Sequence, residues 1–278
     1  MSADGMSELL RLTGVSKTYR RGPRELRVLA GVGLEVQAGE VVCVLGERGQ
    51  GKTTLLQLAA GMKSADSGLV SFRGRDLMAL SDAELSRLRG AEIGWAGKRG
   101  PRTRVRMFDY VAMPLLARAG GRTPWRGWTP PWPRRRGERR GGAGRDVDAR
   151  AWAALERVGA SGCAEQEWET LSDWERALVE VAQAIAGEPA LLLVDDVTDT
   201  LGIRETGELA ALLRSLSREL EMGVLMSVSD PDATLLSDRI MVLSGGRLSA
   251  GPRSAPANVI EFPDLGSQRL TAGQDSSS

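Results

Sequence analysis

One segment constrains the fold more than any other: Gly46–Thr53, GERGQGKT, fits the phosphate-loop pattern G-x-x-x-x-G-K-[ST] at every position. Glycines let backbone N–H groups curl around phosphate oxygens, and the helix that follows presents its positive end to them. In this pattern Lys52 reaches the β- and γ-phosphates, and the Thr53 hydroxyl binds Mg²⁺. The expected nucleotide contacts are Gly46, Glu47, Arg48, Gly49, Gln50, Gly51, Lys52, Thr53 and Thr54. An apolar run, Val41–Leu45, precedes the loop and a helical pattern follows it, which argues against a chance glycine turn.

An acidic position further along the chain complements the loop. Asp195 ends the run ALLLVD, which is typical of a buried parallel strand. A carboxylate at the tip of such a strand, beside a phosphate loop, would hold Mg²⁺ through water. Taken alone, Asp195 would more simply be an acid in a turn after a strand. The phosphate loop favours the metal interpretation, so Thr53 and Asp195 are the candidate magnesium positions.

Composition limits which other chemistry is open to the chain. It has 278 residues and no histidine, which excludes a Ser/His/Asp triad, a Cys/His nucleophile and any imidazole metal site. The length fits one large α/β domain or two small ones. Apolar runs are too short to span a bilayer, no signal peptide is evident, and Cys43 and Cys163 make no disulfide framework. We expect a cytoplasmic protein.

The rest of the sequence alternates between strand and helix patterns. Strands are expected at 9–19, 33–37, 40–45, 69–72, 91–96, 190–194, 223–228 and 239–243. Helices are expected after the phosphate loop, from Ser81, at 108–119, from Asp146, at 172–186 and at 203–221. Asp173 and Glu175 are expected to cap the helix that begins at Ser172. The segment 251–278 is polar and broken by prolines, so we expect a disordered tail.

An insertion rich in Gly, Pro, Arg and Trp interrupts this pattern at 120–145 and is expected to be irregular. Residues 122–145 hold eight arginines and one acid, a local charge of +7, so the remainder of this +1 chain carries −6. The simplest interpretation is a solvated, disordered loop. A second is contact with anionic lipid, because tryptophans among arginines suit the headgroup region. Nucleic-acid binding is disfavoured, since the loop is short and the rest of the chain is acidic.

Further segments carry a resemblance to a known family. LSDWE at 171–175 lies where a signature LSGGQ would stand, and DDVTDTLG at 195–202 lies where a Walker B motif and D-loop would stand. SVSDPDATLLSDRI at 227–240 matches a switch segment. With the phosphate loop, these make Leu9 to Gly251 similar to the ATP-binding subunits of ABC transporters. GRDLMALSDAELSRLRGAEIGW and DYVAMPLL resemble the branch that serves lipoprotein release and macrolide-type export.

The resemblance implies an α/β P-loop NTPase fold with a mixed sheet, an antiparallel N-terminal strand region and an inserted helical subdomain at about 98–187. The whole nucleotide-binding domain would span 8–250. The resemblance further implies that Tyr19 stacks on adenine, that ATP and Mg²⁺ are bound, and that two such subunits form a dimer. The implied partner is a membrane-spanning transporter subunit, which would hold this chain at the inner face of the cell membrane.

The departures from the family pattern fall on its catalytic positions. The Q-loop glutamine is Lys98 (or Gly97, if the register slips by one), the signature glycines are Asp173 and Trp174, the general-base glutamate is Asp196, the D-loop aspartate is Gly202 and the switch histidine is Ser229. In family members ATP lies between two subunits, so a charged Asp173 and a bulky Trp174 would hinder approach to the γ-phosphate. Asp196 is one methylene shorter than glutamate, and Ser229 cannot donate as an imidazole does.

Because one chain carries changes on both halves of the composite site, both sites of a dimer lose catalytic groups. The sequence therefore predicts ATP binding with weak or lost hydrolysis, and Asp196 is a weak candidate for the base. The alternative is a non-catalytic regulatory or scaffold module that uses the same fold. Under that alternative, loss of Lys52 would leave function unchanged.

Overall fold

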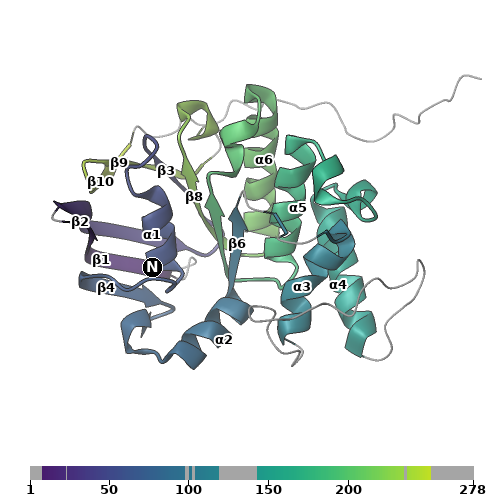
Figure 1. The fold of residues 1–278 in the computed structure, drawn as a ribbon, viewed down its shortest axis with the longest axis horizontal. Helices are drawn as coiled ribbons and strands as arrows, with labels where there is room; N and C mark the ends of the chain where they lie inside the picture. The colour runs from purple at the N-terminus through teal and green to yellow at the C-terminus, as the bar shows by residue number, and fades with distance from the viewer. Residues whose placement is uncertain are drawn as a thin grey trace, which may run out of the picture.

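A computed structural model of the chain describes residues 8–22, 24–97, 100–101, 104–118, 143–234 and 237–251. Its strands form two sheets (Figure 1). The first has the order β2-β1-β4-β5, from β1 (Glu8–Arg21), β2 (Arg24–Gln37), β4 (Ser67–Phe72) and β5 (Arg75–Asp76). The second has the order β10-β9-β3-β8-β7-β6, from β3 (Val41–Leu45), β6 (Ile93–Gly97), β7 (Leu191–Asp195), β8 (Gly223–Val228), β9 (Arg239–Ser244) and β10 (Arg247–Ala250).

The pairing within the sheets defines the architecture. All neighbours in the first sheet are antiparallel. In the second sheet β9, β3, β8, β7 and β6 run parallel, and β10 pairs antiparallel with β9. The strands β3, β7 and β8 are almost entirely apolar and buried, as expected for parallel strands that are covered on both faces. The expected α/β P-loop architecture, with a mixed sheet and an antiparallel N-terminal strand region, is confirmed.

Six helices cover these sheets: α1 (Lys52–Ala59), α2 (Asp82–Glu92), α3 (Met107–Arg118), α4 (Ala143–Arg157), α5 (Asp173–Ile185) and α6 (Ile203–Glu219), within the described part of the chain. Short 3₁₀ turns lie at Leu77–Ala79, Ser161–Cys163, Trp168–Thr170, Val197–Thr200 and Pro231–Thr234. Helix α1 shares one hydrophobic core with the first sheet and one face of the second. Helices α3, α4 and α5 pack on one another and, with α6, cover the opposite face (Figure 1).

Several elements differ from the sequence-based expectations: β1 and β4 begin earlier than expected, and the short strands β5 and β10 were not expected. β2 begins at Arg24 rather than at 33, because pairing with β1 along its whole length stabilises a segment whose own apolar alternation is weak. α2 continues to Glu92, so β6 begins at Ile93 rather than at 91. α4 begins at Ala143, so the expectation of irregular structure up to 145 is wrong for its last three residues. Gly144 lies in the first turn, where the entropic cost of a glycine is smaller than in the interior of a helix.

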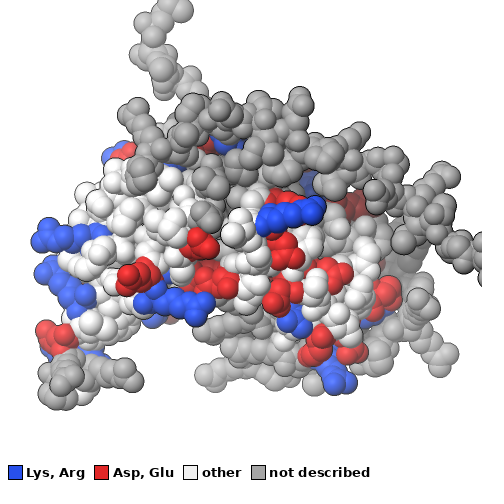
Figure 2. Space-filling view, turned by 90° about the horizontal axis from the view of Figure 1, so that it is seen from above, with Lys and Arg blue, Asp and Glu red and all other residues white. Residues whose placement is uncertain are grey.

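Residues 120–142 of the insertion and 252–278 of the expected tail lie outside the described residues. The interpretations placed on 122–142, including lipid contact, and on the tail therefore stay predictions. Among the helices that the structure describes, none combines the length and the apolar content needed to cross a bilayer. On the described part of the face in Figure 2, acidic side chains gather over the middle and right, with basic ones scattered among them.

Candidate nucleotide site

The phosphate loop lies at the carboxyl end of β3, between that strand and the first turn of α1. Gly51 has a φ of 105°, and an added Cβ would lie 2.4 Å from Val28 Cγ1. At Gly46, an added Cβ would lie 2.7 Å from the carbonyl oxygen of Leu243. Glycine is therefore required at both positions, which leaves the loop backbone open to close approach by a phosphate. This cradle fits a nucleotide phosphate.

Lys52, the first residue of α1, is 3% exposed. Its Nζ donates to the carbonyl oxygens of Gly46 (2.7 Å) and Glu47 (3.2 Å), and to Ser229 Oγ (3.0 Å). Asp196 Oδ1 lies 3.7 Å from the same Nζ. The two carbonyl contacts hold the ammonium group over the loop, and the other two contacts bring the substituted catalytic positions against it.

The candidate magnesium residues lie side by side. Thr53 Oγ1 donates to Asp195 Oδ1 at 2.9 Å, and Ser227 Oγ donates to the same oxygen at 3.0 Å. The described residues contain no group of three or more Cys, Asp or Glu side chains that could hold a metal by themselves. A Mg²⁺ at Thr53 and Asp195 would therefore need phosphate oxygens and water to complete its shell, as is usual at nucleotide sites.

Sequence reasoning missed Ser227. Its hydroxyl also accepts from the backbone N–H of Asp196 at 3.1 Å, so it connects the two acids at the end of β7. The side chain is 1% exposed. A signal was present, because Ser227 is the one hydroxyl in the otherwise apolar strand GVLMSV, and a buried hydroxyl requires a partner.

The candidate catalytic positions follow two neighbouring strands. Asp196 comes directly after β7 with a φ of 51°, a conformation that Asp adopts more readily than most other side chains. Ser229 comes directly after β8. Both reach Lys52, as described above, so the structure places them at the phosphate loop as expected. Lys98 lies outside the described residues, and Gly97 ends β6 in register with Asp195.

Tyr19 lies near the end of β1 and reaches α1. Its hydroxyl accepts from Lys63 Nζ at 2.7 Å and lies 3.4 Å from Thr54 Oγ1. Lys63 Nζ also lies 4.7 Å from the centroid of the ring, within cation–π range. Burial acts to raise the pKa of Tyr19, but hydrogen bonds with Lys63 and Thr54 outweigh it and the pKa is lowered. The ring therefore stands beside the phosphate-loop helix, and Lys63, which no sequence pattern indicated, holds it there.

We expect Tyr19→Ala to weaken ATP binding roughly tenfold, because stacking between a base and an aromatic ring contributes about 1–3 kcal/mol. Tyr19→Phe keeps the ring and loses only the hydroxyl contacts, so it should bind within about a factor of two of wild type. Calorimetric titration with ATP measures both. Equal affinity of the alanine variant and wild type would contradict the adenine role of Tyr19.

Two side chains fix the outer edge of the loop. Arg48 is exposed, and its guanidinium group lies 3.1 Å from Asp199 Oδ2 in the turn after β7. Gln50 Oε1 accepts from the backbone N–H of Gly245, between β9 and β10, at 3.2 Å. These two contacts bind the phosphate loop to the turn after β7 and to the turn between β9 and β10.

The substituted signature segment begins α5, on the opposite face of the parallel sheet from α1 (Figure 1). Ser172 Oγ accepts from the Glu175 N–H at 3.2 Å, and Glu175 accepts from the Ser172 N–H at 2.8 Å, so the cap expected of Glu175 is confirmed, with Ser172 as its partner. The cap expected of Asp173 is not formed, because its carboxylate turns to Arg176. Asp173 lies in the first turn and pairs with Arg176 at 3.1 Å. Trp174 is partly buried against the core that α3 to α6 share. Within one chain, this segment and the phosphate loop are separate.

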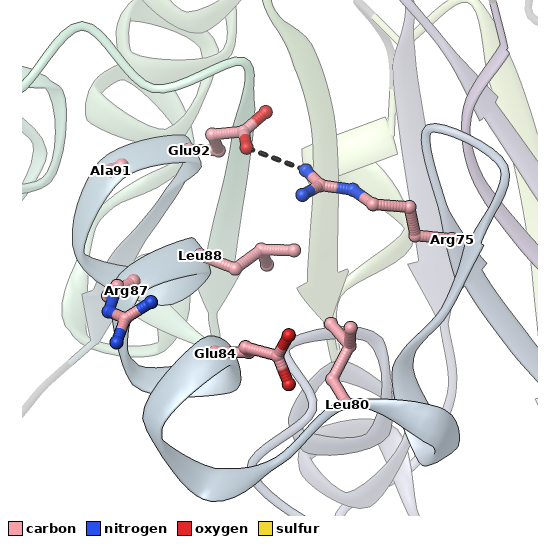
Figure 3. A pocket seen from close by; sticks show the side chains of 7 residues that line it. All are labelled: Arg75, Leu80, Glu84, Arg87, Leu88, Ala91 and Glu92. Carbon is pink, nitrogen blue, oxygen red and sulfur yellow. Dashed lines mark hydrogen bonds and ion pairs between the residues drawn. The ribbon is translucent and has the colours of Figure 1, made fainter.

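A cavity of about 380 Å³ lies between α2 and β5, away from the phosphate loop (Figure 3). Arg75 pairs with Glu92 across it at 2.8 Å, and Leu80 and Leu88 line it. Glu92 directly precedes β6, so this cavity lies at the amino end of the parallel strands. It therefore contributes no residue to the nucleotide site.

The loop, its lysine and the Thr53–Asp195 pair meet at the carboxyl edge of a parallel sheet, as they do in P-loop nucleotide-binding proteins. Comparison with known proteins narrows this class. The model of the ABC transporter family matches residues 29–199, more than half of the chain. The chain belongs to the ABC transporter family, as an ATP-binding subunit. The resemblance drawn from the motifs is thus confirmed.

Relatives include the lipoprotein-releasing system ATP-binding protein LolD of Chromohalobacter salexigens, 31% identical over 87% of this chain and 93% of the relative. The methionine import ATP-binding protein MetN of Nocardia farcinica is 31% identical over 87% of this chain and 69% of the relative. The macrolide export ATP-binding/permease protein MacB of Rhodopirellula baltica is 28% identical over 90% of this chain and 34% of the relative. The dimeric structure of a bacterial ABC transporter cassette shares the fold, with a TM-score of 0.74 at 23% identity over 89% of this chain and 100% of that one.

Proposed function

We propose that this subunit binds ATP with Mg²⁺ at the phosphate loop and hydrolyses it slowly or not at all. One observation carries the proposal: the loop keeps its glycine cradle and buried lysine, while the side chains at the base and switch positions, Asp196 and Ser229, are both directed to that lysine. Binding chemistry is therefore retained where hydrolytic chemistry is altered.

Each residue has a definite part in binding. Bound Mg-ATP would supply the phosphate charge and the metal. Lys52 and the N–H groups of the loop would bind the phosphates, Thr53 and Asp195 would hold the metal, and Tyr19 would stack on the base. Asp196 is short for a general base, and one of its oxygens lies 3.7 Å from Lys52, within ion-pair distance. Ser229 offers a hydroxyl where the family pattern has an imidazole.

The experiment that tests this proposal has two parts. ATP is titrated into the purified subunit with Mg²⁺ and again with EDTA, and phosphate release is followed in the Mg²⁺ sample. We expect Mg²⁺ to raise the affinity and phosphate release to stay near background. Phosphate release at the rate of an ordinary transporter ATPase would contradict the weak-hydrolysis part of the proposal.

We also infer the setting in which this subunit works. Its domain, 8–250 with a helical part at about 98–187, would dock on a membrane-spanning subunit at the inner face of the cell membrane. The names of LolD, MacB and MetN, each an ATP-binding part of a release, export or import system, support this inference. The dimeric cassette structure supports pairing of two nucleotide-binding subunits.

The contacts of Lys52 within this chain favour a second candidate function, a non-catalytic scaffold module. An ammonium group has three N–H donors, and Lys52 already has three acceptors within this chain. ATP must displace at least one of these contacts if Lys52 is to donate to a phosphate. A chain that works without nucleotide would retain this closed arrangement, and the effect of Lys52→Ala separates the two proposals.

The insertion provides a prediction about membranes. We expect replacement of Trp125, Trp128 and Trp132 by serine to lower binding to vesicles containing phosphatidylserine several-fold, because indole rings favour the headgroup region. The arginines stay, so the charge is unchanged, and cosedimentation measures the loss. Unchanged binding of the triple variant would contradict a role for these tryptophans in lipid contact.

A further inference from the structure

Glu180 is a buried acid that the nucleotide site does not use. It lies in the middle of α5 and is 5% exposed, between Val179 and Val181, which are fully buried. Burial of a carboxylate is unfavourable unless hydrogen bonds compensate for the lost water. The Glu180 carboxylate therefore requires hydrogen-bond donors, and the positions of those donors indicate its role.

Glu180 bonds to the end of β6, to Gly100 and to α3. Its Oε1 accepts from the Tyr110 hydroxyl at 3.0 Å and from the Gly100 N–H at 2.9 Å, and its Oε2 accepts from the Gly97 N–H at 3.3 Å. Gly100 has a φ of 56°, and an added Cβ would lie 2.4 Å from Trp168 Cε2, so the backbone packs directly on that ring. Gly97 and Gly100, the described residues on either side of 98–99, are thus both bonded to α5.

The charges around Glu180 are engaged elsewhere. At the start of α3, Arg106 pairs with Asp109 at 2.9 Å. One turn earlier in α5, Arg176 donates to the Trp168 carbonyl and pairs with Asp173. Among the residues that the structure describes, no lysine or arginine forms an ion pair with Glu180, and Lys98 and Arg99 lie outside that set. The described partners that hold the carboxylate are neutral.

Gly97 connects this anchor to the nucleotide site. It is the last residue of β6 and pairs with Asp195, the last residue of β7. Asp195 in turn accepts from Thr53 in the phosphate-loop helix. We propose that Glu180 is a positioning residue of the nucleotide site, which fixes the end of β6 beside Asp195 through hydrogen bonds that only its ionised form accepts in full. The proposal rests on the nucleotide binding proposed above.

Protonation would weaken this anchor at a defined bond. A proton on Oε1 would have to be donated to the Tyr110 hydroxyl, whose own proton would then lose the one acceptor that it has among the described residues. Oε2 accepts only the longer bond, from Gly97, so Oε2 is the oxygen that a proton would occupy. The resulting O–H and the Gly97 N–H are both donors and cannot bond to each other. The contact with Gly97 is then lost, while the contacts with Gly100 and Tyr110 remain.

The titration falls in a range where this chain has few other titrating groups. Burial raises the pKa of Glu180 to about 7, against the lowering effect of its three hydrogen bonds. The chain has no histidine, and burial raises the pKa of Cys43 to about 12 and, together with Glu175, that of Cys163 to about 11. Because the pKa is raised from 4.5 on folding, the contribution of Glu180 to stability is most favourable below pH 4.5 and is lost as the pH rises through about 7.

The test compares ATP affinity from pH 6 to pH 8 in wild type, Glu180→Gln and Tyr110→Phe, with Glu169→Gln as an exposed control for the same chemical change. The amide cannot accept at both ends, so it reproduces the protonated state. We expect wild-type affinity at pH 8 to exceed that of Glu180→Gln roughly three- to tenfold, and the difference to fade toward pH 6. Tyr110→Phe removes a bond that lowers the pKa of Glu180, so the midpoint should move to higher pH.

Thermal melting at pH 8 distinguishes a role of Glu180 in positioning the nucleotide site from a role in stabilising the fold alone. Because the ionised carboxylate is costly to bury, Glu180→Gln should melt at or above the wild-type temperature while binding ATP more weakly. Superimposable affinity profiles for wild type and Glu180→Gln would overturn the proposal, and so would a midpoint that Tyr110→Phe leaves in place. A wild type that binds ATP no better than Lys52→Ala at every pH would instead overturn the proposed function, so the two failures are distinguishable.

Discussion

Lys52→Ala is expected to lower ATP affinity by about 100-fold or more while the chain stays folded. The ammonium group is the one buried cation at the phosphate loop among the described residues, and charge-assisted hydrogen bonds to phosphate contribute about 1.5–3 kcal/mol each. Calorimetric titration with Mg-ATP measures the loss, and circular dichroism checks the fold. Arg204→Ala, which removes an exposed cation that pairs with Glu208, is the matched control and should bind normally.

The same variant decides between the two proposed functions. If Lys52→Ala binds ATP as wild type does, the phosphate loop is not a nucleotide site and the scaffold alternative stands. If it loses ATP but keeps full function in the cell, nucleotide is not needed for that function. Loss of both ATP binding and function is the result that the subunit proposal predicts.

The second large expected effect is a gain in the rate of ATP hydrolysis. The variant that restores five of the six altered family residues, all except Gly202, should release phosphate roughly 100-fold faster than wild type, because a correctly placed general base contributes about 10²–10⁴ to a rate. Its substitutions are Lys98→Gln, Asp173→Gly, Trp174→Gly, Asp196→Glu and Ser229→His. Trp174 is partly buried in the core, so its removal should also cost about 1–3 kcal/mol of stability, and the assay belongs well below the melting temperature.

The control for this gain is the same variant with Lys52→Ala added, which should return phosphate release to background. A restored variant that binds ATP and stays folded but releases no more phosphate than wild type would show that these positions do not limit hydrolysis. Restoration of Asp196→Glu and Ser229→His alone should give little gain, because the signature half of the composite site would still be altered.

Much of this site could be predicted from the sequence because its signals are local. The glycines and Lys52 lie within eight residues, and Asp195 ends an apolar run that can only be a short buried strand or helix turn. Side-chain contacts then follow from the parallel sheet, which brings the carboxyl ends of β3, β7 and β8 to one edge. The pairing of Thr53 with Asp195 is a consequence of that topology.

Other features depend on contacts between distant residues. Glu180 and Gly97 are 83 positions apart, and Lys63 and Tyr19 are 44 apart, so no local spacing indicates either contact. The early start of β2 is likewise a product of pairing with β1, since its glycine-interrupted pattern is weak alone. Glu180 did carry a faint signal, as a lone acid in the buried stretch of a helix, but its partner could not be read from the sequence.

The most direct test of the central claim is the identity of the nucleotide that stays with the protein. The purified subunit is incubated with Mg²⁺ and ATP, free nucleotide is removed, and the bound species is separated by chromatography beside a Lys52→Ala sample. The account predicts intact ATP on wild type and none on the variant. Bound ADP, with an equivalent of phosphate released as fast as an ordinary transporter ATPase turns over, would contradict it, because the substituted residues would then still support the reaction at full rate.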